Sequence, residues 1–190
     1  MRVESLRRDY LRQRESLSAE EVARRSGAVL STLIESDLLT SGMHVGLYHP
    51  FRGEVDVLPL ISFRKDVTYY LPRCRDVFLE YCPWQLGDPL ADPLVAGRWR
   101  IPEPAPQVSS VSLNSLDLIV VPGVVFDFRG HRLGFGQGCY DRMLTSFNGV
   151  AVGVAYDFQV VAEIAVQPHD QSCDWVVSEQ AVLRGTPRRL

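Results

Sequence analysis

Residues 116–121 constrain the fold more than any other part of this sequence, because five of these six residues are aliphatic. A strand of that composition has no polar face and is typical of the centre of a parallel sheet. Parallel strands need long crossover connections, and these connections place helices on the faces of the sheet. The run therefore predicts an α/β protein with its sheet covered on both sides.

The rest of the chain alternates between helical and strand patterns, as such a sheet requires. We expect helices over residues 1–17, after the capping box formed by Ser18 and Glu21, and over 55–63. Further strands are predicted at 43–50, 66–72, 76–84, 149–156 and 174–179, and a long ordered loop at the proline-rich residues 83–107. The predicted fold is an open, three-layer, mostly parallel α/β sheet in one domain, residues 1–190.

Composition narrows the class of protein. The apolar fraction of 46% and the net charge of -3 are typical of a soluble globular protein and argue against broad nucleic-acid binding. The charged N-terminus lacks the apolar core of a signal peptide, and no run of about 18 apolar residues predicts a membrane span. The four cysteines lack the spacing of a zinc site or a disulfide framework. We expect a cytoplasmic protein with reduced thiols and with neither a nucleic-acid nor a membrane partner.

A glycine cluster lies between the aliphatic run and a segment that can begin a helix. Four glycines fall within nine residues, at Gly130, Gly134, Gly136 and Gly138. Bare backbone N–H groups can bind an anion, an arginine such as Arg132 can bind phosphate through two N–H groups, and a carboxylate such as Asp141 can hold magnesium. The spacing matches neither a P-loop nor a dinucleotide-binding motif. From the residues alone, a phosphate site and a tight strand–helix turn both remain open.

The same segment carries a resemblance to a known family. "VPGVVFDFRGHRLGFGQGCYDRML" resembles the signature of the 5-formyltetrahydrofolate cyclo-ligase family, R-L-G-x-G-x-G-x-Y-D preceded by Pro-Gly and Phe-Asp. "LRRDYLRQRESLSAEE", "LYHPFRGEVDVLPLI", "YYLPR", "WRIPEP" and "VQPHDQSCDWVVSE" resemble other family segments, in order along the chain. The resemblance implies a sheet like that of NagB, RpiA and the CoA transferases. It also implies the conversion of 5-formyltetrahydrofolate and ATP to 5,10-methenyltetrahydrofolate, ADP and phosphate, with Mg²⁺.

The resemblance implies a role for each matching site residue. The expected catalytic residues are Arg132 and Tyr140. The expected ATP-binding residues are Arg2, Arg7, Arg132, Leu133, Gly134, Phe135, Gly136, Gln137, Gly138, Cys139 and Tyr140. The expected folate-binding residues are His49, Glu54, Phe135, Gly136, Gln137, Gly138 and Cys139, and the expected magnesium ligands are Asp141 and Asp170. Trp84 and Trp99 are candidates for lining the folate site or for the core.

Two departures from the family pattern keep alternatives open. Val3 stands where the family has a lysine, with Arg2 next to it, and Cys139 stands where a tyrosine is usual. A non-catalytic relative that binds folate or nucleotide is therefore the alternative function, and an unrelated sugar-phosphate enzyme on a similar sheet is a third. Without the resemblance, Arg7 is read as a solvated helix charge and Asp170 as a solvated loop aspartate, and for Glu54 a helix-start charge and a binding role both remain open. We expect a monomer or weak homodimer acting on folate with or without a polyglutamate tail.

Overall fold

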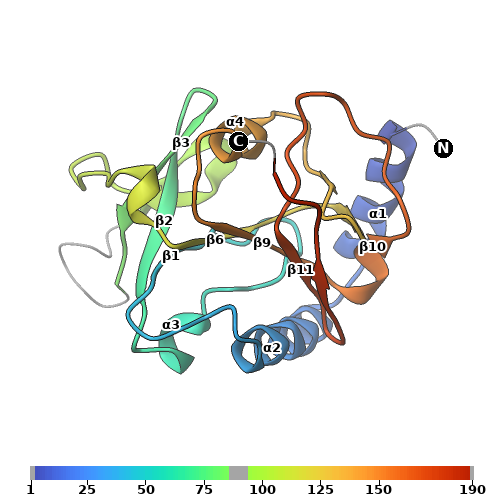
Figure 1. Cartoon of the computed structure of the whole chain (residues 1–190), viewed down its shortest axis with the longest axis horizontal. Coiled ribbons are helices and arrows are strands. Elements are labelled where there is room, and N and C mark those ends of the chain that lie inside the picture. The colour runs from blue at the N-terminus through green and yellow to red at the C-terminus, as the bar shows by residue number, and fades with distance from the viewer. Residues whose placement is uncertain (1–2, 86–93, 189–190) are drawn as a thin grey trace.

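The computed structural model describes residues 3–85 and 94–188, and a seven-stranded sheet runs through its middle (Figure 1). The strand order is β12-β11-β9-β6-β1-β2-β3. The bounds of the strands are β1 His44–Gly46, β2 Thr68–Arg75, β3 Phe78–Pro83, β6 Leu118–Val121, β9 Val150–Val154, β11 Trp175–Val177 and β12 Val182–Arg184. The neighbouring strands from β2 to β11 pair in parallel, and β3 and β12 add antiparallel edges. The predicted mostly parallel sheet is confirmed.

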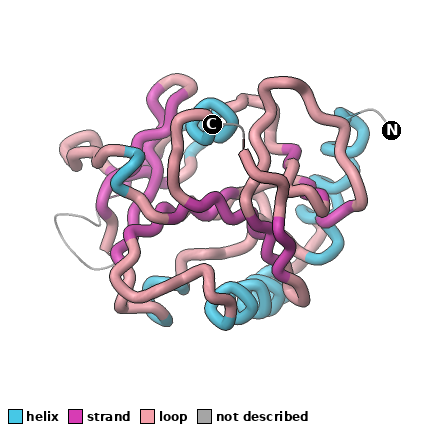
Figure 2. The backbone as a smooth tube through the Cα atoms, viewed as in Figure 1, coloured by secondary structure: helices cyan, strands magenta, loops and turns pink. Residues whose placement is uncertain are grey.

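The central strand β6 is buried on both faces, as its composition predicts. Leu118 and Val120 pack in the core beneath α2 (Ala19–Glu35) and α3 (Leu60–Phe63). Ile119 and Val121 pack in a second core with α4 (Cys139–Leu144). Figures 1 and 2 show α2 and α3 on one side of the sheet and α4 on the other, which makes the three layers.

The first two helices form where the sequence predicts them. The helix α1 (Val3–Glu15) packs Leu6 and Tyr10 against a third small core. The helix α2 begins at the capping box, in which the Ser18 hydroxyl accepts from the Glu21 N–H and the Glu21 carboxylate accepts from the Ser18 N–H. None of the helices in the described ranges is long and apolar enough to cross a membrane.

Two predictions are wrong. The helix predicted over 55–63 is reduced to the single turn of α3, because Pro59 restricts the residue before it and permits helix only after it. The predicted loop over 83–107 contains, in its described part, an antiparallel pair of strands, β4 (Leu94–Ala96) and β5 (Pro102–Pro104), joined through a short helix η1 (Arg98–Arg100). A two-stranded ribbon accepts prolines because each strand has a free edge. Residues 86–93 of this segment lie outside the described ones.

A small second sheet separates β6 from the glycine cluster and was not predicted. Its strands are β7 (Val125–Asp127), β8 (Arg132–Leu133) and β10 (Val160–Val161), in the order β10-β7-β8. The turn from β7 to β8 requires Gly130, whose φ is 85° and where a Cβ atom would lie 2.2 Å from the Cys173 carbonyl oxygen. The hairpin presents the glycine segment at 134–138 between β8 and α4.

Candidate active site

A cavity of ≈ 950 Å³ opens beside the glycine segment. Its walls come from α1, the loop after β1, the end of β6, the glycine segment, α4 and the loop before β11. The predicted site residues that line it are Arg7, His49, Glu54, Arg132, Leu133, Gly134, Phe135, Gly136, Gln137, Gly138, Cys139, Tyr140, Asp141 and Asp170. The structure thus brings together every predicted site residue that it describes. Arg2 lies outside the described residues.

The glycine segment at 134–138 alternates three glycines, which have no side chains, with Phe135 and Gln137. Gly136 and Gly138 have φ angles of 88° and 65°, a region that favours glycine. A Cβ atom at Gly136 would have the Arg7 guanidinium as its nearest neighbour, 3.7 Å away. The Arg7 side chain is fixed there because its Nε donates to the Gly134 carbonyl at 2.7 Å. An anion resting on this segment would therefore meet backbone amides on one side and a cation on the other.

Arg132 and Asp141, at the two ends of the segment, are paired with each other. The Arg132 Nη2 donates to the Asp141 Oδ1 at 2.9 Å, and the same oxygen accepts from the Gln171 N–H at 3.3 Å. Arg132 is buried, its Nε has no hydrogen-bond partner, and its guanidinium lies 5.5 Å from the Tyr140 ring centroid. Burial raises the pKa of Tyr140 well above its usual range, so its hydroxyl stays protonated.

Asp170 lies on the same cavity wall, in the loop before β11. Its Oδ2 accepts from the Gln167 N–H at 2.7 Å, and its Oδ1 is 3.7 Å from the His169 Nε2. Within the described ranges no three His, Cys, Asp or Glu side chains form a ready metal cluster. Two carboxylates still suit Mg²⁺, which keeps several waters and commonly takes one or two carboxylates together with substrate phosphates.

Glu54 lies on the opposite side of the cavity, in the loop after β1. It is 6% exposed, and its Oε2 accepts from the Phe51 N–H at 3.1 Å. Burial raises the pKa of Glu54 to about 7, although the charge of Arg14 and the Phe51 hydrogen bond act in the opposite direction. His49 is half-buried beside it, with its Nδ1 3.3 Å from the Pro50 carbonyl oxygen.

Arg14, on α1, was not among the predicted site residues. Arg14 is fully buried against the loop that carries Glu54. Its spacing from Arg7, about two helical turns, is the signal that places both side chains on one face of α1. The two candidate tryptophans have different environments. Trp99 is half-exposed and lines the cavity, whereas Trp84 packs in the core.

Comparisons with known proteins identify the family of this chain. A model of the 5-formyltetrahydrofolate cyclo-ligase family matches residues 2–179. The 5-formyltetrahydrofolate cyclo-ligase of Escherichia coli K12 is 35% identical over 150 residues, which cover 73% of this chain and 79% of that protein. An NMR structure of Aquifex aeolicus 5,10-methenyltetrahydrofolate synthetase, 36% identical, superposes with a TM-score of 0.84 over 100% of this chain and 96% of its own. A Mycoplasma pneumoniae synthetase, 22% identical, shares the fold with a TM-score of 0.76, over 95% of this chain and 100% of its own.

The family match spans the segments that line the cavity and the strands of the seven-stranded sheet other than the edge strand β12. The quoted motifs, the fold and the relatives thus point to one group of proteins. This chain belongs to the 5-formyltetrahydrofolate cyclo-ligase family of enzymes.

Proposed function

We propose that the protein converts 5-formyltetrahydrofolate to 5,10-methenyltetrahydrofolate, consuming ATP and releasing ADP and phosphate, as a cytoplasmic step of one-carbon metabolism. The observation that carries the proposal is the cavity, whose lining brings the glycine segment together with four arginines and four carboxylates. The proposal uses two of the arginines, Arg7 and Arg132, and three of the carboxylates, Glu54, Asp141 and Asp170. These groups divide into partners for the phosphates, for a divalent cation and for the folate.

The reaction needs an activated leaving group. The N5 formyl oxygen is a poor one, and transfer of the γ-phosphoryl group of ATP to that oxygen gives an iminophosphate and ADP. The N10 amine then attacks the formyl carbon and loses its proton, and the carbon–oxygen bond to phosphate breaks. Phosphoryl transfer depends mainly on positioning and on neutralising charge. Backbone N–H groups and fixed guanidinium groups supply both.

The phosphates of ATP are assigned to the glycine segment, Arg7 and Arg132. In this proposal the Arg132–Asp141 pair separates when the nucleotide binds, so that Arg132 faces phosphate oxygens and Asp141 faces Mg²⁺ with Asp170. Bound Mg²⁺ would neutralise phosphate charge. Tyr140, whose ring lies beneath the Arg132 guanidinium, orients that guanidinium and offers a neutral hydroxyl to the reactants.

The folate is assigned to the side of the cavity that holds Glu54 and His49. The pterin edge presents neighbouring N–H donors, which a carboxylate accepts in a charge-assisted pair. Glu54 has one oxygen held by the Phe51 N–H, so its orientation is fixed before a ligand arrives. The aromatic ring of Phe135 lines the cavity, with its centroid 5.8 Å from that of Phe51, and suits contact with the folate rings.

A direct assay tests the proposal. Purified protein with 5-formyltetrahydrofolate, ATP and Mg²⁺ is expected to produce the absorbance of methenyltetrahydrofolate together with one ADP per product. Val3 lines the cavity at the position of the family lysine, and this favours the alternative of a non-catalytic binding relative. Calorimetry separates the two functions: binding of folate and ATP without product supports the alternative, and binding of neither overturns both.

A further inference from the structure

A buried arginine lies behind the folate side of the cavity without lining it. Arg14 has no exposed surface, whereas its neighbours Arg12 and Gln13 on α1 are exposed. It does not belong to the lining of the cavity. Burying a guanidinium is unfavourable unless specific partners compensate for its lost hydration. The contacts of Arg14 therefore indicate which parts of the chain its buried charge positions.

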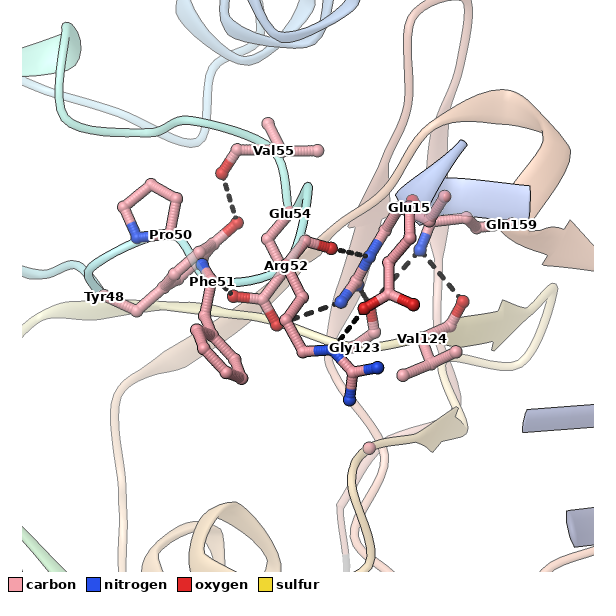
Figure 3. A network of polar contacts seen from close by, with 12 residues as sticks. Glu15, Tyr48, Pro50, Phe51, Arg52, Glu54, Val55, Gly123, Val124 and Gln159 are labelled. Atoms are coloured by element: carbon pink, nitrogen blue, oxygen red, sulfur yellow. Dashed lines mark hydrogen bonds and ion pairs between the residues drawn. The ribbon is translucent and has the colours of Figure 1, made fainter. Parts of the chain in front are cut away.

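The guanidinium joins three separate segments of the chain. Its Nε donates to the Arg52 carbonyl at 3.0 Å, and its Nη1 donates to the Gly123 carbonyl at 2.8 Å. Its Nη2 makes no hydrogen bond and lies 3.7 Å from the Glu54 Oε1. Figure 3 shows Arg52, Gly123 and Glu54 converging on this point. Arg14 thus ties α1 to the end of β6 and to the loop after β1.

That loop has a backbone conformation that needs an external constraint. Arg52 and Gly53, the two residues before Glu54, have φ angles of 52° and 73°. The left-handed region is unfavourable for a residue with a side chain, so Arg52 has to be held in it. The hydrogen bond from the Arg14 Nε holds the Arg52 carbonyl. The direction of the Glu54 side chain therefore depends on Arg14.

Charge also links the two residues. Burial raises the pKa of Glu54 to about 7, and the Arg14 charge is the largest influence that lowers it. The other titratable groups that act on Glu54 or on Arg14 are the phenols of Tyr48, Tyr140 and Tyr156 and the carboxylate of Glu15. The three phenols are neutral at physiological pH because burial raises the pKa of each.

We infer that Arg14 is a positioning residue, which holds the loop that carries Glu54 so that its carboxylate is turned toward the cavity where the pterin N–H groups bind. Arg14 itself does not touch the substrate. The inference rests on the proposed function, in which Glu54 binds the folate. It adds the reason why part of the Glu54 carboxylate stays ionised near neutral pH although it is buried.

The test compares Arg14→Met and Arg14→Lys with Arg12→Met, a matched change at an exposed position of α1. Two quantities are measured: the pH dependence of KM for 5-formyltetrahydrofolate, and the midpoint of the Glu54 carboxyl ¹³C titration without ligand. Arg14→Met is expected to raise KM roughly ten- to a hundredfold at pH 7, with a smaller change in kcat, and to move both midpoints to higher pH. Arg14→Lys keeps a cation and is expected to restore the midpoints partly, and Arg12→Met is expected to change neither quantity.

The outcomes separate the inference from the proposed function. If Glu54→Gln leaves folate affinity unchanged, the folate role of Glu54 in the proposed function is wrong. If Glu54→Gln weakens folate binding but both Arg14 variants keep the parental midpoints, the positioning role alone is wrong. If Arg14→Met does not fold, the test rests on Arg14→Lys. The inference is wrong if Arg14→Lys has the parental KM and the parental Glu54 midpoint. It is supported if Arg14→Lys raises the KM and moves the Glu54 midpoint to higher pH.

Discussion

The pair formed by Arg132 and Asp141 is the residue-scale feature closest to the proposed phosphate chemistry. The Arg132 guanidinium and the Asp141 carboxylate neutralise each other at 2.9 Å. Arg132 is buried, so this pairing avoids an isolated charge within the protein. In the proposed function, a phosphate and Mg²⁺ would offer Arg132 and Asp141 new partners of opposite charge.

Asp141→Asn tests the metal role of this pair. The amide keeps the shape of the side chain and its carbonyl can still accept from Arg132, but it carries no charge for Mg²⁺. We expect turnover to fall roughly 10- to 100-fold at low Mg²⁺, the effect of losing one charge-assisted contact, and to recover partly as Mg²⁺ is raised. Initial rates against Mg²⁺ concentration measure this.

Asp9→Asn is the control for that experiment, because Asp9 is an exposed carboxylate on α1 that does not line the cavity. It is expected to leave the Mg²⁺ dependence unchanged. An Asp141→Asn enzyme with the parental rate and the parental Mg²⁺ dependence would show that Asp141 is only a partner for Arg132.

Arg132→Lys tests the other member of the pair. A lysine keeps the positive charge but loses the planar fork that binds two phosphate oxygens at once. We expect kcat to fall by more than the affinity for ATP, because the lost contacts matter most as charge develops on the transferred group. Steady-state rates with calorimetric ATP binding measure the two effects, and a loss of ATP affinity with an unchanged kcat would place the role of Arg132 in ground-state binding.

At the scale of elements, the strip from Gly134 to Gly138 combines two requirements of the backbone. Gly136 and Gly138 need positive φ angles to turn the chain from β8 into α4. Gly136 also leaves space toward the cavity, where the nearest neighbour of a Cβ atom would be the Arg7 guanidinium at 3.7 Å, whereas a Cβ atom at Gly138 would lie 3.1 Å from the Arg142 Nη1. A side chain at Gly136 would thus cause strain and would also occupy the proposed phosphate site.

Gly136→Val and Gly42→Val separate strain from function. Gly42 has a φ of 82°, close to the 88° of Gly136, but it lies outside the cavity and a Cβ atom there would have no neighbour within 4 Å. We expect both variants to lose about 1–2 kcal/mol of stability from the left-handed backbone. Only Gly136→Val is expected to lose turnover. Melting temperatures and initial rates of the two variants make the comparison, and similar activity in both would place the phosphates elsewhere.

Elements whose environment is fixed by their own composition were predictable. The aliphatic run that became β6 has to be covered on both faces whatever its neighbours are, and the capping box of Ser18 and Glu21 is a local contact. The segment over 55–63 was not predictable in this way, because its apolar residues fit a helix while Pro59 confines the helix to the residues after it. The glycine cluster marked the cavity because bare backbone is itself a local property.

Residues whose role depends on distant segments were harder to identify. The arginines of α1 look alike in sequence, and Arg14 differs from Arg12 only because α1 packs against the loop after β1. The pairing of Arg132 with Asp141 likewise arises from the hairpin of β7 and β8, which no pattern in the chain predicted. Tertiary contacts set these environments, so periodicity and motif spacing do not contain them.

At the scale of the whole molecule, the buried pair of Glu54 and Arg14 joins the first helix to the central sheet. It lies among tyrosines and backbone carbonyls instead of in water. Charges held in this way cost stability that the surrounding packing has to offset. Keeping an ionisable group buried beside the cavity therefore lowers the stability of the folded protein, and it also makes the free energy of unfolding depend on pH.

Glu54→Gln is expected to increase stability relative to the parent, by an amount that grows as pH rises. The pKa of Glu54 is raised from 4.5 to about 7, so between these values the folded parent binds more protons than the unfolded chain and its stability falls as pH rises. Glutamine does not titrate, so the free energy of unfolding of the variant does not fall with pH for this reason. Relative to the parent, the variant should gain up to about 3 kcal/mol between pH 4.5 and pH 8. Urea unfolding of both proteins across that range measures the difference, and a constant difference would mean that Glu54 titrates alike in the folded and unfolded states.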